Sequence, residues 1–232
     1  MSGQQVKVRS SNGGEFDCYL SLPAGNAKVP AIVLASAVHG VDADVRGIAD
    51  AFAAAGYIAA APDLFWRTIP GPIPRDDTRA AERSQPRLPV IKGGEADMAD
   101  TLAMVRKLPQ HNGKAAAMGF CFGGPYAVLG PKRLGYDAGI GCHSTQMKDF
   151  LHEFDGLAKP VCLIWGDQDT AAPPEVQAAY VAKAKTMPNL DVHIFPGILH
   201  GYMMPANTKA YSAGTREFSM GKALGLLDAL RT

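Results

Sequence analysis

The sequence predicts one α/β domain in which a mostly parallel β-sheet is covered by helices on both faces. Continuous apolar runs such as residues 30–35 (PAIVLA) are typical of strands that are buried on both faces of a sheet. Stretches with helical apolar spacing, such as residues 44–55, alternate with these runs along the chain. The 232 residues, 47% of them hydrophobic and 19% charged, suffice for a single core, so we expect one domain over residues 1–232.

The first part of the chain begins with a hairpin. Residues 6–9 and 16–20 flank the turn sequence Ser-Asn-Gly-Gly at 11–14, which predicts two antiparallel strands at the edge of the sheet. After the hairpin we expect the buried strand 30–35, the helix 44–55 with Gly56 placed to end it, and the strand 57–61.

Residues 64–92 interrupt this alternation. They are rich in Pro and Arg, and residues 69–74 (IPGPIP) form the clearest non-repetitive piece. A long irregular insertion over the strand ends of an α/β sheet is typical of a lid or substrate loop, which is the role we expect here. The alternation then resumes with helix 95–108, strand 114–119, a helix from Gly123, strands 138–142 and 161–165, a helix after Pro173, strand 192–195 and helix 215–231.

Composition argues against several classes of protein. The net charge of +1 gives no reason to expect nucleic acid or a membrane surface as a partner. Residues 1–7 lack the apolar core of a signal peptide, and the longest apolar stretch, 29–38, is too short to span a bilayer, so we expect a cytoplasmic protein. The cysteines lack paired spacing, which predicts reduced thiols rather than a disulfide framework or a zinc site: Cys18, Cys121, Cys142 and Cys162.

The hexapeptide 119–124 (GFCFGG) carries the strongest chemical signal. It directly follows the apolar run 115–118. A strand that ends in Gly-x-nucleophile-x-Gly and opens a helix is the nucleophile elbow of the α/β-hydrolase fold, where only small residues fit beside the nucleophile. Here the nucleophile position holds Cys121, so the sequence predicts a thiolate whose pKa is lowered by the start of the following helix.

A thiol nucleophile needs a base and an acid that orients the base. In this fold the acid and then the histidine follow the nucleophile along the chain. The strand 161–165 leads to Asp167 and Asp169, and the next strand leads to His200, all at the edge of the sheet where ligands bind. We predict a triad of Cys121, His200 and Asp169, with Asp167 as the alternative acid or as a residue that caps the turn.

Other polar groups are expected around this triad. The backbone N–H groups of Phe122 and Val38 are the predicted oxyanion hole, because Val38 lies in the loop after the strand 32–35. His39 and His143 also follow strands and are expected to line the pocket without acting as the base. The remaining histidines are expected in a strand (His193), a turn (His111) and a surface helix (His152).

Four segments together carry a family resemblance over nearly the whole chain. They are the Gly-x-Cys-x-Gly-Gly elbow, residues 61–65 (APDLF), Gly166-x-x-Asp169 and the motif Pro-Gly-x-x-His-Gly-Tyr at 196–202. With these residues placed, the chain resembles the dienelactone hydrolase (carboxymethylenebutenolidase) family. The resemblance implies a hydrolase without cofactor or metal that opens an enol-lactone through a cysteinyl acyl-enzyme. It also implies a monomer or weak homo-oligomer, with Tyr202 near the substrate.

The chain departs from the family pattern at two positions. Ala37 stands where family members have a glutamate that interacts with the resting thiol, and Met204 stands where they have one of two arginines that hold the substrate carboxylate. A methionine cannot make the bidentate contact of an arginine. The arginines of the 64–92 segment are either substitutes or solvated surface groups; Arg79 and Arg83 are the two expected at the substrate, beside Arg75 and Arg87.

The main expectation is therefore a cysteine hydrolase that acts on a small-molecule activated ester or lactone. A carboxylesterase or thioesterase with the same triad is one alternative. A redox-responsive or ligand-binding protein, in which Cys142 becomes the partner of Cys121, is another.

Overall fold

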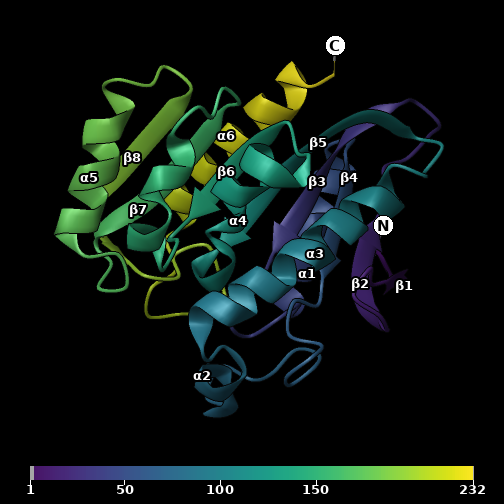
Figure 1. Ribbon diagram of the computed structural model, residues 1–232, viewed down its shortest axis with the longest axis horizontal. Helices are drawn as coiled ribbons and strands as arrows, with labels where there is room; N and C mark the ends of the chain where they lie inside the picture. The colour runs from purple at the N-terminus through teal and green to yellow at the C-terminus, as the bar shows by residue number, and fades with distance from the viewer. Residues whose placement is uncertain (1–2, 232) are drawn as a thin grey trace.

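The computed structural model describes residues 3–231 and contains an eight-stranded sheet with the strand order β1-β2-β4-β3-β5-β6-β7-β8 (Figure 1). β1 and β2 pair antiparallel, as do β2 and β4, whereas each neighbouring pair from β4 to β8 is parallel. The predicted hairpin and the mostly parallel sheet are thus confirmed. Residues 1, 2 and 232 of the predicted domain lie outside the described part. The strands are β1 Gln4–Arg9, β2 Glu15–Ser21, β3 Val29–Ala35, β4 Ile58–Pro62, β5 His111–Phe120, β6 Ala138–Cys142, β7 Val161–Gln168 and β8 Leu190–Leu199.

Helices cover both faces of this sheet. Side chains alternate along β3, so that Ile32 and Leu34 pack in one core with residues of α1 and α6, while Ala31 and Val33 pack in another with residues of α3. Figure 1 shows α4 in front of the sheet and α6 behind it. Within residues 3–231, no helix has the length and apolar character needed to cross a membrane. The helices are α1 Ala43–Ala54, α2 Arg79–Arg83, α3 Arg87–Val105, α4 Tyr126–Leu129, α5 Pro174–Ala184 and α6 Ala213–Ala229.

The segment 64–92 is more helical than its composition predicts. It contains α2 and the start of α3, which begins at Arg87 rather than at Glu95. Glycines are weak helix formers, and the pair at 93–94 hides this start in the sequence. The structure uses Gly94 for packing. The hydroxyl of Tyr126 donates to the Ile91 carbonyl at 2.7 Å, and a Cβ at position 94 would clash with that hydroxyl.

The helix predicted from Gly123 is also different in the structure. A 3₁₀ turn (Cys121–Gly123), the short α4 and a π-helical turn (Gly130–Leu134) follow one another. Pro125 and Pro131 lack an N–H group, so the α-helical hydrogen bonds cannot run through this segment unbroken. His111 also differs from expectation, since it is the first residue of β5, whereas His152 lies as expected in a helix at the surface, the short 3₁₀ helix Leu151–Phe154.

The parallel strands place the chemically active segments at one edge of the sheet. The carboxyl ends of β3, β5, β6, β7 and β8 lie at the same edge because the strands run in the same direction. Val38, Cys121, His143, Asp169 and His200 each follow the end of one of these strands. In an open α/β sheet this edge is where ligands bind.

Candidate active site

The turn after β5 holds Cys121 in a strained backbone conformation. Its φ is +51°, a value that residues other than glycine rarely adopt. The Cys121 carbonyl accepts hydrogen bonds from the N–H groups of Gly124 and Thr145, both at 3.0 Å. A Cβ at Gly119 would clash with the Gly123 carbonyl, and one at Gly123 would clash with the Ala35 carbonyl. The glycines are therefore required by the close approach of backbone segments, as expected for a nucleophile elbow.

His200 and Asp169 are joined by a hydrogen bond. His200 follows β8, and its Nδ1 lies 2.9 Å from each carboxylate oxygen of Asp169, which follows β7. Asp169 is only 2% exposed, and its Oδ1 also accepts from the Ala171 N–H at 2.9 Å. This contact fixes the proton of the neutral imidazole on Nδ1 and leaves Nε2 to interact with the thiol.

Asp167, the alternative acid, has a different partner. Its side chain is exposed and accepts a hydrogen bond from the Gly197 N–H at 2.7 Å. That contact links β7 to β8 and does not cap the turn after β7; the Oδ1 atom that accepts from the N–H two residues on belongs to Asp169. Of the two aspartates, the one bonded to His200 is Asp169.

The electrostatics of the site favour a charged thiolate and a charged imidazole. Burial opposes ionisation of the Cys121 thiol, but the hydrogen bond and charge of His200, the Phe122 N–H and the charge of Arg87 outweigh it, and the pKa of Cys121 falls below its ordinary value. Burial also disfavours a charged His200, but hydrogen bonds to Asp169 and Cys121 raise the pKa of His200 to about 10. The opposite shifts stabilise a thiolate–imidazolium pair.

His143 packs directly against His200. Their ring centroids are 5.0 Å apart in an edge-to-face arrangement, and His143 makes a similar contact with Tyr202 at 5.3 Å. His143 is 1% exposed, and neither ring nitrogen has a hydrogen-bond partner in another described residue. Burial and the nearby charge of His200 hold the pKa of His143 well below its ordinary range, so this ring is neutral.

Tyr202 and His39 have partners that limit their roles. Tyr202 is fully buried, and its hydroxyl shares a hydrogen bond of 2.9 Å with Ser219. Its ring packs edge-to-face against the ring of His143 and so helps to hold that ring in place. His39 is half-buried beside the 73–75 segment, and its carbonyl accepts from the Ile73 N–H at 3.0 Å. Burial, reinforced by the charge of Arg75, lowers the pKa of His39.

The arginines of the 64–92 segment differ sharply in their surroundings. Arg79 is 57% exposed and pairs with Asp77 at 2.6 Å, so its charge is already matched outside the site. Arg83 is fully buried over the Phe65 ring, 4.2 Å from its centroid. Its nearest carboxylate, that of Asp63, lies 3.6 Å away, and its guanidinium nitrogens have no hydrogen-bond partner among residues 3–231. Apart from the ion pair with Asp63, the guanidinium donors of Arg83 therefore lack a hydrogen-bond acceptor among the described residues.

Arg87 also lies near Cys121. Its charge contributes to the lowered pKa of Cys121, and its Nη1 lies 3.5 Å from the hydroxyl of Thr145. From the sequence, Arg79 was expected at the substrate in preference to Arg87. The signal that identifies Arg87 is Pro86 directly before it, which marks the start of α3, but the helix was expected to begin at Glu95.

The fold and the turn at Cys121 define the class of this protein. A mostly parallel eight-stranded sheet with a tight strand-to-helix turn around the nucleophile position is the α/β-hydrolase fold. The chain belongs to the dienelactone hydrolase family, because the model of that family matches residues 16–230. It is accordingly a hydrolase that acts on ester or lactone bonds.

Known proteins resemble the chain over its whole length. It is 26% identical to carboxymethylenebutenolidase 1 of Cupriavidus pinatubonensis over 235 residues, which cover 100% of this chain and 99% of that protein. It is 25% identical to the carboxymethylenebutenolidase of Pseudomonas putida, with the same coverage. Among solved structures, a dienelactone hydrolase-like promiscuous phosphotriesterase from metagenomic libraries superimposes with a TM-score of 0.82 at 17% identity, covering 100% of both chains. An esterase of Pyrococcus furiosus does so with a TM-score of 0.70 at 13% identity, covering 98% of this chain and 92% of that one.

Proposed function

We propose that the protein hydrolyses a small ester or enol-lactone through a covalent intermediate on Cys121. The observation that carries this proposal is the hydrogen-bonded series Cys121–His200–Asp169, in which the pKa of the thiol is lowered and that of the imidazole is raised. This arrangement supplies a charged nucleophile, a proton donor for the leaving group and a buried acid that orients the base.

The reaction follows from these positions. The Cys121 thiolate attacks the carbonyl carbon, and the backbone N–H groups of Phe122 and Val38 stabilise the oxyanion. The imidazolium of His200 gives its proton to the leaving oxygen as the C–O bond breaks, which forms the thioester. Neutral His200, held by Asp169, then takes a proton from water, and the hydroxide attacks the thioester and releases the acid and the thiolate.

The surroundings of the site support a substrate that carries a carboxylate. Ala37 and Met204 are buried and apolar, so they cannot supply the glutamate and arginine contacts of the family pattern. We propose that Arg83 and Arg87 bind the carboxylate instead, because Arg87 lies over the ring of Phe122 and Arg83 lies over Phe65, whose tilted ring contacts Phe122. The segment 64–92 then acts as the substrate loop, since it contains both side chains.

The test is turnover of dienelactone and of p-nitrophenyl acetate by wild type, Cys121→Ala and the matched control Cys18→Ala, in which a buried thiol of β2 is removed. We expect Cys121→Ala to lower kcat/KM for both substrates by at least about 1000-fold and the control to retain activity. Acid quenching of wild type during aryl ester turnover should leave one acetyl group on Cys121, detected by peptide mass spectrometry. Equal turnover by wild type and Cys121→Ala would refute the proposed nucleophile.

A redox function through Cys142 has less support. Burial raises the pKa of the Cys142 thiol to about 12, and the side chain is hydrogen-bonded to Tyr202 and Ser219. Cys142 belongs to the core around α1 and α6, whereas Cys121 packs against the core on the α3 face. A disulfide between them would require the backbone to move. A broader carboxylesterase or thioesterase with the same mechanism is distinguished by turnover of the aryl ester or an acyl thioester without turnover of dienelactone.

A further inference from the structure

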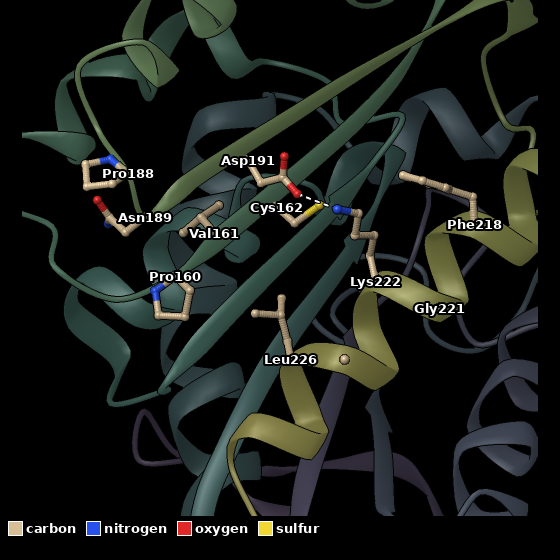
Figure 2. Close-up of a pocket in the computed structure, with 11 residues that line it drawn as sticks. Pro160, Val161, Cys162, Pro188, Asn189, Asp191, Phe218, Gly221, Lys222 and Leu226 are labelled. Atoms are coloured by element: carbon tan, nitrogen blue, oxygen red, sulfur yellow. Dashed lines mark hydrogen bonds and ion pairs between the residues drawn. The ribbon is translucent and has the colours of Figure 1, made fainter.

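A second group of chemically active side chains lies on β7 and β8, away from the triad. Cys162 of β7 is paired in register with Asp191 of β8, and His193 lies two residues beyond Asp191. Residues at spacing two project to the same face of a strand, so all three side chains share one face of the sheet. Figure 2 shows the Cys162 sulfur, the Asp191 carboxylate and the Lys222 ammonium of α6 pointing toward one another.

The ligand atoms of the three strand residues are close together. The Cys162 sulfur, an Asp191 carboxylate oxygen and a ring nitrogen of His193 all lie within 4.8 Å of one another. The His193 Nε2 is 2.8 Å from Asp191 Oδ2, so these two groups are already in direct contact.

We propose that Cys162, Asp191 and His193 form a zinc site, which we name the β7–β8 site. Thiolate sulfur, imidazole nitrogen and carboxylate oxygen are the ligands of Zn²⁺, and metal bonds of about 2.0–2.3 Å place such ligand atoms about 3–4 Å apart. The neighbouring cavity of about 510 Å³, lined by Phe218 and Gly221 of α6 among others, provides room for a water molecule as the fourth ligand.

Lys222 is the cation that the metal ion must displace. Its Nζ lies 2.8 Å from Asp191 Oδ2, and its side chain is 36% exposed, so the ammonium can swing into solvent. Binding also releases the proton of the Cys162 thiol, because the metal ligand is the thiolate. Lys222 therefore competes with the metal ion for Asp191 and weakens metal binding, so that removing the Lys222 charge should strengthen it.

A metal ion here would act on the structure without entering the reaction. It would crosslink β7 and β8, the strands that lead to Asp169 and His200. Since the unfolded chain does not hold the three ligands together, zinc would stabilise the folded protein as its concentration rises above Kd. The site is independent of the proposed hydrolase mechanism, and its test does not use activity.

The test uses the Cys121→Ala background, because the catalytic thiol and His200 would also bind metal. Co²⁺ is the probe, since a cobalt–thiolate bond gives a near-ultraviolet charge-transfer band, and Zn²⁺ affinity is measured by its displacement of Co²⁺. We expect the band in this background and its loss on adding Cys162→Ser. His193→Gln and Asp191→Asn should each weaken zinc binding by at least about 10- to 100-fold. Removing a group that only hydrogen-bonds to a metal ligand already causes a loss of this size, so removing a ligand itself should cost at least as much.

Two further variants make the outcome decisive. Lys222→Gln should strengthen zinc binding by about two- to fivefold, because it removes the ion pair that competes for Asp191. His152→Gln is the matched control, since His152 is exposed and lies 3.5 Å from a carboxylate oxygen of the buried Glu153, in a pair that lacks a thiol. Absence of the thiolate band, or equal zinc affinity in His193→Gln and His152→Gln, would overturn the proposal even if Cys162→Ser fails to fold.

Discussion

Two aspartates at the end of β7 provide a sharp test of the proposed acid. Asp169→Asn removes the carboxylate that holds the Nδ1 proton of His200, whereas Asp167→Asn changes an exposed side chain bonded to the Gly197 N–H. The two substitutions are chemically identical and lie two positions apart. We expect Asp169→Asn to be strongly impaired and Asp167→Asn to behave almost as wild type.

The expected magnitude follows from the pKa of His200. A pKa of about 10, against 6.5 for an ordinary histidine, corresponds to roughly 5 kcal/mol in favour of the imidazolium. Asp169 and Cys121 share this stabilisation, and a hydrogen bond to a charged group contributes about 1.5–3 kcal/mol of it. Loss of that contribution in Asp169→Asn should lower kcat/KM by roughly 10- to 150-fold.

The pH dependence has a definite sign. The ion pair exists above the lowered pKa of Cys121 and is lost as the pH rises through about 10, where His200 loses its proton. In Asp169→Asn the pKa of His200 falls, so Cys121 loses part of its charged partner and its pKa rises toward the ordinary value. Alkylation of Cys121 by iodoacetamide should therefore reach half its maximal rate at a higher pH than in wild type.

The assay combines kcat/KM for p-nitrophenyl acetate with the alkylation rate between pH 5 and pH 10, the window over which a perturbed thiol titrates. Peptide mass spectrometry restricts the alkylation signal to Cys121. An unchanged alkylation profile in Asp169→Asn, or a larger loss of activity in Asp167→Asn, would refute the assignment of Asp169 as the acid.

Three further predictions concern backbone packing, substrate charge and the neutral histidine. Gly123→Ala should destabilise the protein by roughly 3 kcal/mol or more in urea unfolding, because the new Cβ would clash with a backbone carbonyl. Gly221→Ala lies in open space on α6 and should stabilise the protein by about 0.5–1 kcal/mol. Equal effects of the two substitutions would contradict this reasoning. Arg83→Met should raise KM for dienelactone by roughly tenfold or more and leave KM for the neutral aryl ester nearly unchanged; a similar rise for both would argue against carboxylate binding. His143→Phe should keep kcat, because the ring contact with His200 remains. It should also raise the free energy of unfolding by about 1 kcal/mol, because it removes two buried nitrogens that lack a hydrogen-bond partner among the described residues. A lower thermal unfolding temperature than that of wild type would contradict this prediction.

The sequence predicted the sheet well because its strands are strongly patterned. Strands buried on both faces are continuous apolar runs, and the predicted 138–142 strand coincides with β6. The helices were harder to predict. α3 begins before two glycines that weaken the helical pattern of the sequence, and one of them, Gly94, leaves the space that the Tyr126 hydroxyl occupies. The elbow segment breaks into short helical turns at its prolines, which composition alone does not place.

The sequence by itself determined the elbow and the order of Cys121, aspartate and His200, since a tight turn requires glycines in the local sequence and parallel strands bring their ends to one edge. Only the tertiary structure decided which aspartate meets His200, because Asp167 is still within β7 and contacts β8, whereas Asp169 follows the end of β7 and contacts His200. The same holds for Arg83, whose burial over Phe65 depends on how a long segment folds back, and for the β7–β8 site. Spacing in sequence shows no metal site there, because the register between two strands, rather than any local motif, brings the thiol, carboxylate and imidazole together.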